Sequence, residues 1–211
     1  MQKSAAMPNT LSVTGEGQVK AKPDVATINL GVLTTSKRAQ DAVAENAQRM
    51  TQVIERMKKL GVPAKDLQTL GFNISPVVDH DEKSPNFGQI IEYRVEATLS
   101  VRAEVDMAGR VLDEGVSAGA NVAGSLSFGL RNQTPQKTQA LKAAVEAARR
   151  DADTVAEAMG MKIKGSTTIE VQRGGAPIIV RSLLRADSTP QTTFEPGVLT
   201  ISATVRIVFT Y

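Results

Sequence analysis

The chain has 211 residues, of which 41% are hydrophobic and 22% are charged, so it can bury a core in one domain or in two tightly joined ones. Its 25 Lys and Arg residues against 22 Asp and Glu give a net charge of +3, too small an excess to indicate a nucleic-acid partner. The chain has no cysteine and a single histidine, His80, which excludes disulfides, thiolate metal sites and cysteine nucleophiles.

Alternation of apolar and polar side chains predicts most of the strands. Residues 91–104 and 199–211 follow a strict period of two, which is typical of antiparallel strands with one face in water. In chain order the expected strands are 11–20, 25–35, 67–78, 89–104, 122–130, 163–173 and 198–211. The longest of these strands exceed the dimensions of a compact chain of this length, so we expect them to bend, bulge or protrude.

Three amphipathic helices are expected between the strands. The first follows Ser36, which is a plausible cap, and stops at Gly61, a residue suited to a left-handed turn. The second helix begins at Asp106. The third has Thr134 as its cap and ends before Gly160. Their apolar stripes predict that all three pack on sheets.

The order of these elements predicts the fold. Residues 25–130 run strand, helix, strand, strand, helix, strand, which is the split β-α-β (ferredoxin-like) plan. The remainder adds a C-terminal helix and long strands. We therefore expect an α+β fold whose antiparallel sheets carry helices on one face, in a domain over 11–211 that follows a disordered polar tail at 1–10.

The segment 174–197 is flanked by Gly and Pro, as a long loop would be, yet its centre is aliphatic. The large aliphatic residues, which we take as candidates for self-association, are Ile178, Ile179, Val180, Leu183 and Leu184. They either pack on their own sheet or bind another molecule. A short helix, which would place Arg181 and Arg185 on one face, is favoured over a β-hairpin arm.

Two short motifs carry residue types that occur in binding sites. Asp79, His80, Asp81 and Glu82 offer ligands for a divalent cation, but consecutive loop residues cannot all point inward, so a solvated turn is the preferred interpretation. Gly15-Glu16-Gly17 lacks the sequence of a phosphate-binding loop and is interpreted as a bulge or bend in a strand. No catalytic, cofactor or metal residues are assigned.

Short motifs in a fixed order along nearly the whole chain resemble the SIMPL domain family. They are VTGEG at 13–17, KPDVAT at 22–27, LGVP at 60–63, DLQT at 66–69, VSAGAN at 116–121, SFGL at 127–130, AAV at 143–145, AEA at 156–158, EPG at 195–197 and SATV at 202–205. The family includes bacterial proteins labelled periplasmic immunogenic protein and oxidative stress defence protein. None of the motifs is catalytic.

The resemblance implies an exported, periplasmic protein that often self-associates, with no assigned enzymatic activity and no cofactor. It also implies that a leader was removed ahead of this chain and that any attachment to the outer membrane is peripheral. We therefore expect a non-enzymatic, homo-oligomeric cell-envelope protein linked to stress tolerance. The alternative is a periplasmic module that binds a small ligand or a metal, using the loop at 79–82 or a cleft between the sheet and the third helix.

Overall fold

The structure, a computed structural model, describes residues 9–173, 178–180 and 194–211. The described chain divides into two compact units, each with a sheet and a core of its own. Unit 1 takes residues 9–22, 130–173, 178–180 and 197–211, and unit 2 takes residues 23–129 and 194–196.

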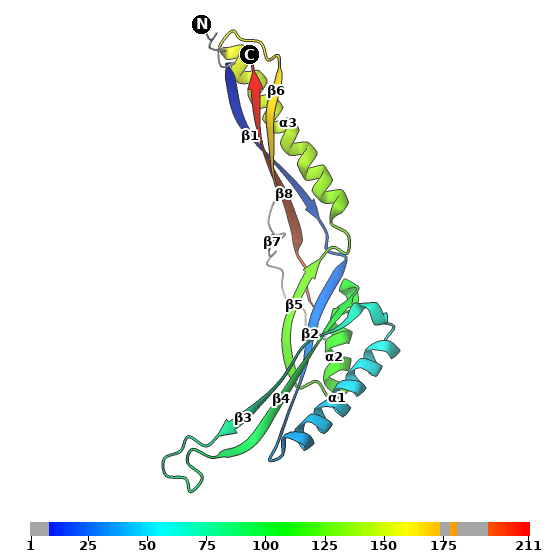
Figure 1. The fold of residues 1–211 in the computed structure, drawn as a ribbon. Helices are drawn as coiled ribbons and strands as arrows, with labels where there is room; N and C mark the ends of the chain where they lie inside the picture. Colours follow the sequence, from blue (N-terminus) through cyan, green and yellow to red (C-terminus); the bar gives the residue numbers. More distant parts are fainter. Residues whose placement is uncertain (1–8, 174–177, 181–193) are drawn as a thin grey trace. The chain divides into compact units, whose positions relative to one another are not determined.

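Unit 2 has the predicted split β-α-β plan (Figure 1). Its elements are β2 (Val25–Ser36), α1 (Ala39–Lys59), η1 (Ala64–Asp66), β3 (Leu67–Val78), β4 (Ile90–Ala103), η2 (Val105–Met107), α2 (Ala108–Ser117) and β5 (Val122–Gly129). The sheet order is β3-β4-β2-β5 and every neighbouring pair is antiparallel. The parallel strands β2 and β3 are therefore split by β4, which confirms the expectation.

Both helices of unit 2 pack on the same face of its sheet. The strands contribute alternate residues to this core, among them Leu30, Val32, Leu99 and Val101, while the helices contribute their apolar stripes. Phe194, in the chain just before β8, packs against the same core. The aromatic end of the 174–197 segment therefore folds back onto its own protein.

A buried polar contact fixes α1 on the sheet. The Asn46 side chain is 1% exposed, and its amide nitrogen donates hydrogen bonds to the carbonyl oxygens of Val32, at 2.7 Å, and Val95, at 3.2 Å. Because Val32 is in β2 and Val95 is in β4, one helix residue binds two adjacent strands. An unpaired amide would be costly at this depth, so the contact defines the position of the helix.

Unit 1 is a smaller antiparallel sheet with one long helix (Figure 1). Its elements are β1 (Thr10–Ala21), α3 (Thr134–Ala158), β6 (Gly165–Arg173), β7 (Ile178–Val180) and β8 (Val198–Thr210). The order is β1-β8-β6, and β7 also pairs with β8. Since β1 pairs with β8 from residue 199 to residue 210, β7 occupies the same edge of β8 as β6 does.

The α3 helix lies unusually close to β1. Its buried face is a row of alanines, at 140, 144, 148, 152 and 156, which lets the helix backbone approach the sheet. A Cβ atom added at Gly15 would lie 2.1 Å from the Ala144 carbonyl oxygen, and one added at Gly17 would lie 2.1 Å from that of Ala140. Two glycines on one face of the strand therefore provide the space for the helix.

This packing corrects the interpretation of Gly15-Glu16-Gly17 as a bulge. Strands β1 and β8 pair residue for residue from Thr10 to Ala21 with no shift of register. The glycines are needed because a neighbouring backbone occupies the volume of a side chain. Of the longest strands, which the sequence expects to bend, bulge or protrude, β4 has an irregularity, where its register against β3 shifts between Val77 and Val78. The shorter strands β5 and β6 also shift register, against β2 and β8 respectively.

The helix ends confirm the predicted glycine stops but not the predicted N-terminal caps. Gly61 and Gly160 have φ of 96° and 66°, which confirms the left-handed stops after α1 and α3. The two predicted caps are wrong. The Ser36 hydroxyl lies three residues before α1 begins, and it accepts a hydrogen bond from the Arg38 amide. Residue 134 is already inside α3, and its amide donates to the Asn132 side chain.

Candidate functional site

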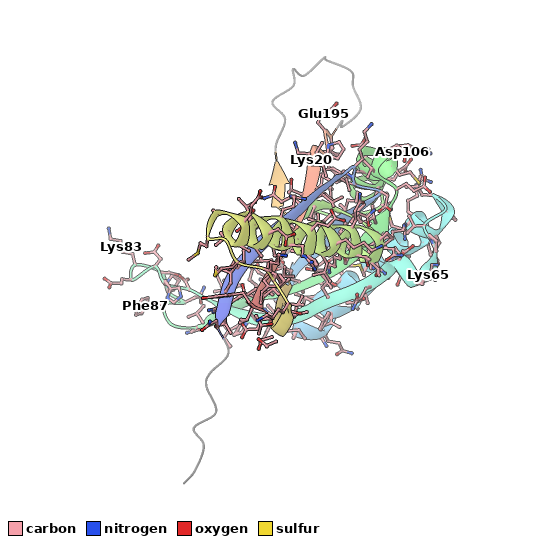
Figure 2. The ribbon with its side chains drawn as sticks, turned by 90° about the horizontal axis from the view of Figure 1, so that it is seen from above. Lys20, Lys65, Lys83, Phe87, Asp106 and Glu195 are labelled. Atoms are coloured by element: carbon pink, nitrogen blue, oxygen red, sulfur yellow. The ribbon has the colours of Figure 1, made fainter. Side chains whose placement is uncertain are left out.

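The loop that carries Asp79, His80, Asp81 and Glu82 connects β3 to β4. Figure 2 shows two of its later residues, Lys83 and Phe87, projecting from the tip of this connection. Inside the loop, the Asp79 carboxylate accepts hydrogen bonds from the Ser84 hydroxyl at 2.5 Å and from the Asp81 amide at 2.9 Å. The hydroxyl chiefly, and then the amide, lower the pKa of Asp79 below its ordinary value.

These contacts make Asp79 a structural residue of the turn. Both of its carboxylate oxygens bind the loop itself, and His80, Asp81 and Glu82 are exposed. Over the residues that the structure describes, no three His, Asp or Glu side chains are grouped so that they could hold a metal ion. The loop thus has the geometry of a solvated turn.

The predicted self-association segment is only partly described. Residues 178–180 form β7 and pair with 200, 199 and 198 of β8, so they adopt the strand that the sequence treated as the weaker alternative to a helix. The backbone partner β8 explains this conformation, since an edge of a strand is available there. Leu183, Leu184 and the two arginines lie outside the described residues.

Large exposed apolar side chains gather on two edge strands. On β3 they are Leu70, Phe72 and Ile74, and they are followed by Phe87 in the connection to β4 and by Ile90 and Ile91 at the start of β4. On β6 they are Ile169 and Val171. Both strands lie at the edge of their sheet and pair with one neighbour each in the described chain. The alternation of the sequence predicts both strands but not this exposure, although the absence of charged residues in β3 is a signal of it.

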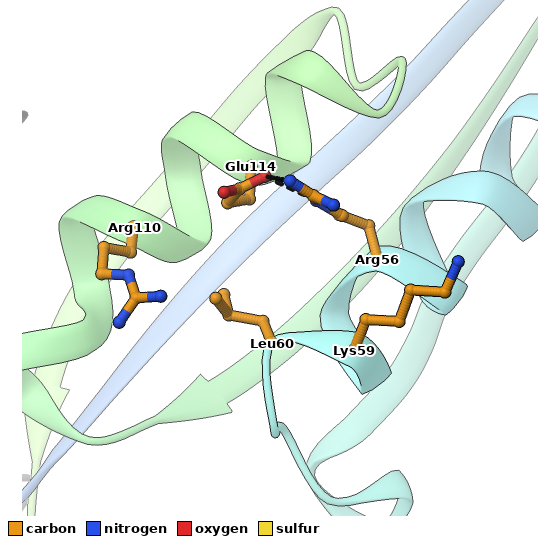
Figure 3. A pocket seen from close by; sticks show the side chains of 5 residues that line it. All are labelled: Arg56, Lys59, Leu60, Arg110 and Glu114. Atoms are coloured by element: carbon orange, nitrogen blue, oxygen red, sulfur yellow. Dashed lines mark hydrogen bonds and ion pairs between the residues drawn. The ribbon is translucent and has the colours of Figure 1, made fainter.

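A shallow pocket of about 190 Å³ lies between the end of α1 and α2 (Figure 3). It is lined by Arg56, Lys59, Leu60, Arg110 and Glu114. Arg56 forms an ion pair with Glu114, which joins the two helices. Three cations against one carboxylate give the pocket a positive balance, which favours a small anion over a cation as a ligand.

No helix in the described part of the chain is both long enough and apolar enough to cross a bilayer.

Comparison with known proteins extends over almost the whole chain. The 26 kDa periplasmic immunogenic protein of Brucella melitensis is 34% identical over 211 residues, which cover 96% of this chain and 84% of the relative. The protein of the same name from Brucella abortus is equally similar. The uncharacterized protein YggE of Escherichia coli is 27% identical over 201 residues, covering 93% of this chain and 80% of YggE.

The sequence model of the SIMPL family, described as a protein of unknown function (DUF541), matches residues 11–209. That match includes the strands and helices of both units, from β1 to β8. The short motifs that carry the resemblance, the split β-α-β plan of unit 2 and the extent of the match agree with one another. The chain therefore belongs to the SIMPL family.

Proposed function

We propose that the chain is a non-enzymatic, self-associating protein of the bacterial periplasm that contributes to stress tolerance. Its location is supported by the Brucella relatives, which are named periplasmic proteins. The link to stress tolerance is supported by the resemblance to a family that includes oxidative stress defence proteins. The absence of an enzymatic role is inferred from a sequence with no cysteine, one histidine and no recognisable catalytic motif.

Self-association is supported chiefly by the exposed apolar side chains on the two edge strands. Edge strands of soluble proteins are usually protected, because their free backbone groups pair readily with another chain. Here Ile169 on β6 is 58% exposed and Phe72 on β3 is 54% exposed. Exposed apolar side chains of this size on an edge strand are typical of binding sites for other proteins.

The segment predicted from sequence adds a second region for contact. Residues 178–180 extend the β6 edge of β8 with three aliphatic residues. Changing Ile179 to Asp, alone and together with Leu183→Asp, tests whether this segment is an interface. An interface predicts a folded chain of smaller mass in solution, whereas a core segment predicts that stability and assembly fail together. A variant that keeps both its thermal midpoint and its mass would defeat either interpretation.

Light scattering of the purified chain is the direct test of assembly. A mass that is a stable multiple of the 22.4 kDa chain supports the proposal, and a monomer at all working concentrations refutes it. Fractionation of the native organism tests the location, because recovery solely in the cytosol would contradict export. Deletion of the gene, followed by growth under oxidant, tests the contribution to stress tolerance.

A small-ligand module is the second candidate, and the basic pocket beside α2 favours it. Calorimetry with phosphate and citrate, and in parallel with divalent cations at the loop 79–82, separates this candidate from the first. Arg110→Gln is the variant of choice for the pocket, since Arg56 also joins the two helices through Glu114. Heat of binding that disappears in Arg110→Gln would support a ligand site. The absence of binding heat with all of these ions would refute the small-ligand candidate.

A further inference from the structure

The outer edge of β3 is unusual among the edges of the two sheets. Strand β3 is twelve residues long and none of them is charged. Natural edge strands are commonly protected by charged side chains, especially lysine. The edge strands of unit 1 follow that rule, since β1 carries Glu16 and Lys20 and β6 carries Glu170. The β3 edge therefore lacks the usual barrier to pairing.

The apolar face of the sheet continues onto β3 beyond the helices. Phe72 and Ile74 pair with Ala97 and Val95 of β4, which are buried on the face that α1 covers. Directly paired residues of antiparallel strands point to the same face. Helix α1 packs mainly on β4 and β2, so Phe72 and Ile74 are left 54% and 44% exposed (Figure 1).

The part of the β3 edge that can pair with another strand is a short segment, limited at both ends by features of the backbone. A shift of register between Thr69 and Gly71 marks a bulge at one end, and Pro76, which has no amide hydrogen, marks the other. The residues between them, 71–75, read Gly, Phe, Asn, Ile, Ser. This pattern is nearly symmetric about its centre, with a large apolar residue on each side of Asn73 and a small residue beyond each.

The β5 edge at the other side of the same sheet provides a comparison. Strand β5 also lacks charged residues, but its larger side chains, Leu126 and Phe128, pack partly against the core. Its exposed positions are small, namely Gly124, Ser125 and Ser127. An uncharged edge and exposed large apolar side chains therefore coincide on β3 and not on β5.

We propose that the β3 edge binds the β3 edge of a second copy of this chain, antiparallel, about a two-fold axis beside Asn73. This inference rests on the self-association proposed above and names its surface. The axis places Phe72 opposite Ile74 of the second copy, and Gly71 opposite Ser75 of the second copy. The contact is isologous. It joins the four-stranded sheet of unit 2 in one copy to the same sheet in the second copy.

The absence of charge in residues 71–75 favours a second copy of this chain as the partner of the β3 edge. In an antiparallel contact between identical strands, a charged residue on the axis meets its own like, which is destabilising. Residues 71–75 avoid this, because none of them is charged and a polar, neutral Asn lies at the centre. The same axis on β6 at Glu170 would bring two carboxylates together.

Phe72→Lys, measured by light scattering, is the first test. It places a charge on the proposed contact at an exposed site where the monomer fold tolerates it. Val116→Lys is the matched control, since it makes the same kind of change at an apolar residue of α2 that is 55% exposed and lies outside both edge strands. The proposal expects Phe72→Lys to halve the mass, or to raise the dissociation constant at least tenfold, with unchanged circular dichroism.

Cross-linking is the second test, and the cysteine-free chain makes it specific. Asn73→Cys places two thiols opposite each other at the axis, within the range of cross-strand disulfides. Under mild oxidation it should form a covalent dimer several-fold more than Ser127→Cys, at an exposed position of the β5 edge, does. The cross-link also reports on the contact if Phe72→Lys proves unstable.

The outcomes separate this proposal from the broader one. If the unsubstituted chain assembles but Phe72→Lys keeps its mass and Asn73→Cys does not cross-link, the β3 contact is refuted while self-association stands. If the unsubstituted chain is monomeric at every concentration, the proposed self-association itself fails. Loss of mass in Phe72→Lys together with the Asn73→Cys dimer supports the β3 contact.

Discussion

Replacing Gly17 with alanine should destabilise unit 1, because there is no room for a side chain between β1 and α3. The added Cβ would lie 2.1 Å from the Ala140 carbonyl oxygen and 2.5 Å from the Ala144 amide nitrogen. Real Cβ atoms essentially never approach other heavy atoms closer than 3.0 Å. Both obstructing atoms belong to the backbone of α3, which cannot rotate away as a side chain can.

The magnitude follows from two opposing terms. To clear the new methyl group, α3 has to retreat from β1 by roughly 1 Å, and overpacking of this kind costs about 1 to 3 kcal/mol or more. We take the upper part of that range because backbone atoms are involved. The lost flexibility of the unfolded chain returns about 0.4 to 1 kcal/mol for Gly→Ala. The net expected loss is about 2 kcal/mol.

Urea unfolding followed by circular dichroism measures this loss, and Gly165→Ala is the matched control. Gly165 is also in a strand of unit 1, but the nearest atom to the position its Cβ would take is Thr210 Oγ1, at 4.0 Å. The control should therefore unfold no earlier than the unsubstituted chain. With a denaturant dependence of about 2 kcal/mol per molar urea, Gly17→Ala should lower the midpoint of unit 1 by about 1 M.

A second substitution tests the cause of the loss. Adding Ala140→Gly to Gly17→Ala removes a methyl group from α3 but leaves the obstructing carbonyl oxygen in place. The double variant should therefore be no more stable than Gly17→Ala. Equal midpoints for Gly17→Ala and Gly165→Ala, or full rescue by Ala140→Gly, would refute the close approach of the two backbones.

Three further predictions concern unit 2. Asn46→Ala should cost about 2 to 4 kcal/mol in chemical unfolding, because it removes two buried hydrogen bonds from α1 to strand carbonyls; a loss under about 1 kcal/mol would contradict this role. Ser84→Ala should raise the pKa of Asp79 toward its ordinary value in an NMR titration. Since the lowered pKa stabilises the fold above the unfolded-state pKa and this contribution is lost as pH falls through the folded-state pKa, the variant should lose stability at neutral pH and not in strong acid. His80→Ala should change the free energy of unfolding by no more than about 0.5 kcal/mol and leave any stress phenotype intact, because the imidazole is exposed. Loss of the phenotype in a folded variant would indicate that the loop 79–82 is a functional site.

The alternating strands were predictable because one physical rule determines them. In β8 the residues Leu199, Val205 and Phe209 are buried, and the polar residues between them face outward. A strand with helix on one side and water on the other must alternate, so the sequence carries the pattern directly. The order of strands in unit 2 was equally accessible, since the split β-α-β plan follows from the order of its elements.

The helix caps and the paired glycines were not predictable by the same means. A Ser or Thr near the start of a helix signals a cap, but its hydroxyl can instead accept a hydrogen bond from an amide that precedes the helix. Ser36 does this with the amide of Arg38. Gly15 and Gly17 have two interpretations in a strand, a bulge or a close neighbour. The information that separates them lies far away in the sequence, in the alanine row of α3.

The candidate interface shows a different limit of sequence reasoning. Alternation in β3 indicates which residues share a face, but exposure of Phe72 and Ile74 depends on how far α1 reaches across the sheet, and no residue of β3 encodes that. The charges of a strand do encode whether it tolerates an open edge. Helix α1 does not cover β3, and a lysine on β3 would protect its exposed edge from pairing with another chain. Since β3 carries none, its exposure has to be relieved by a partner or kept at the cost of solubility.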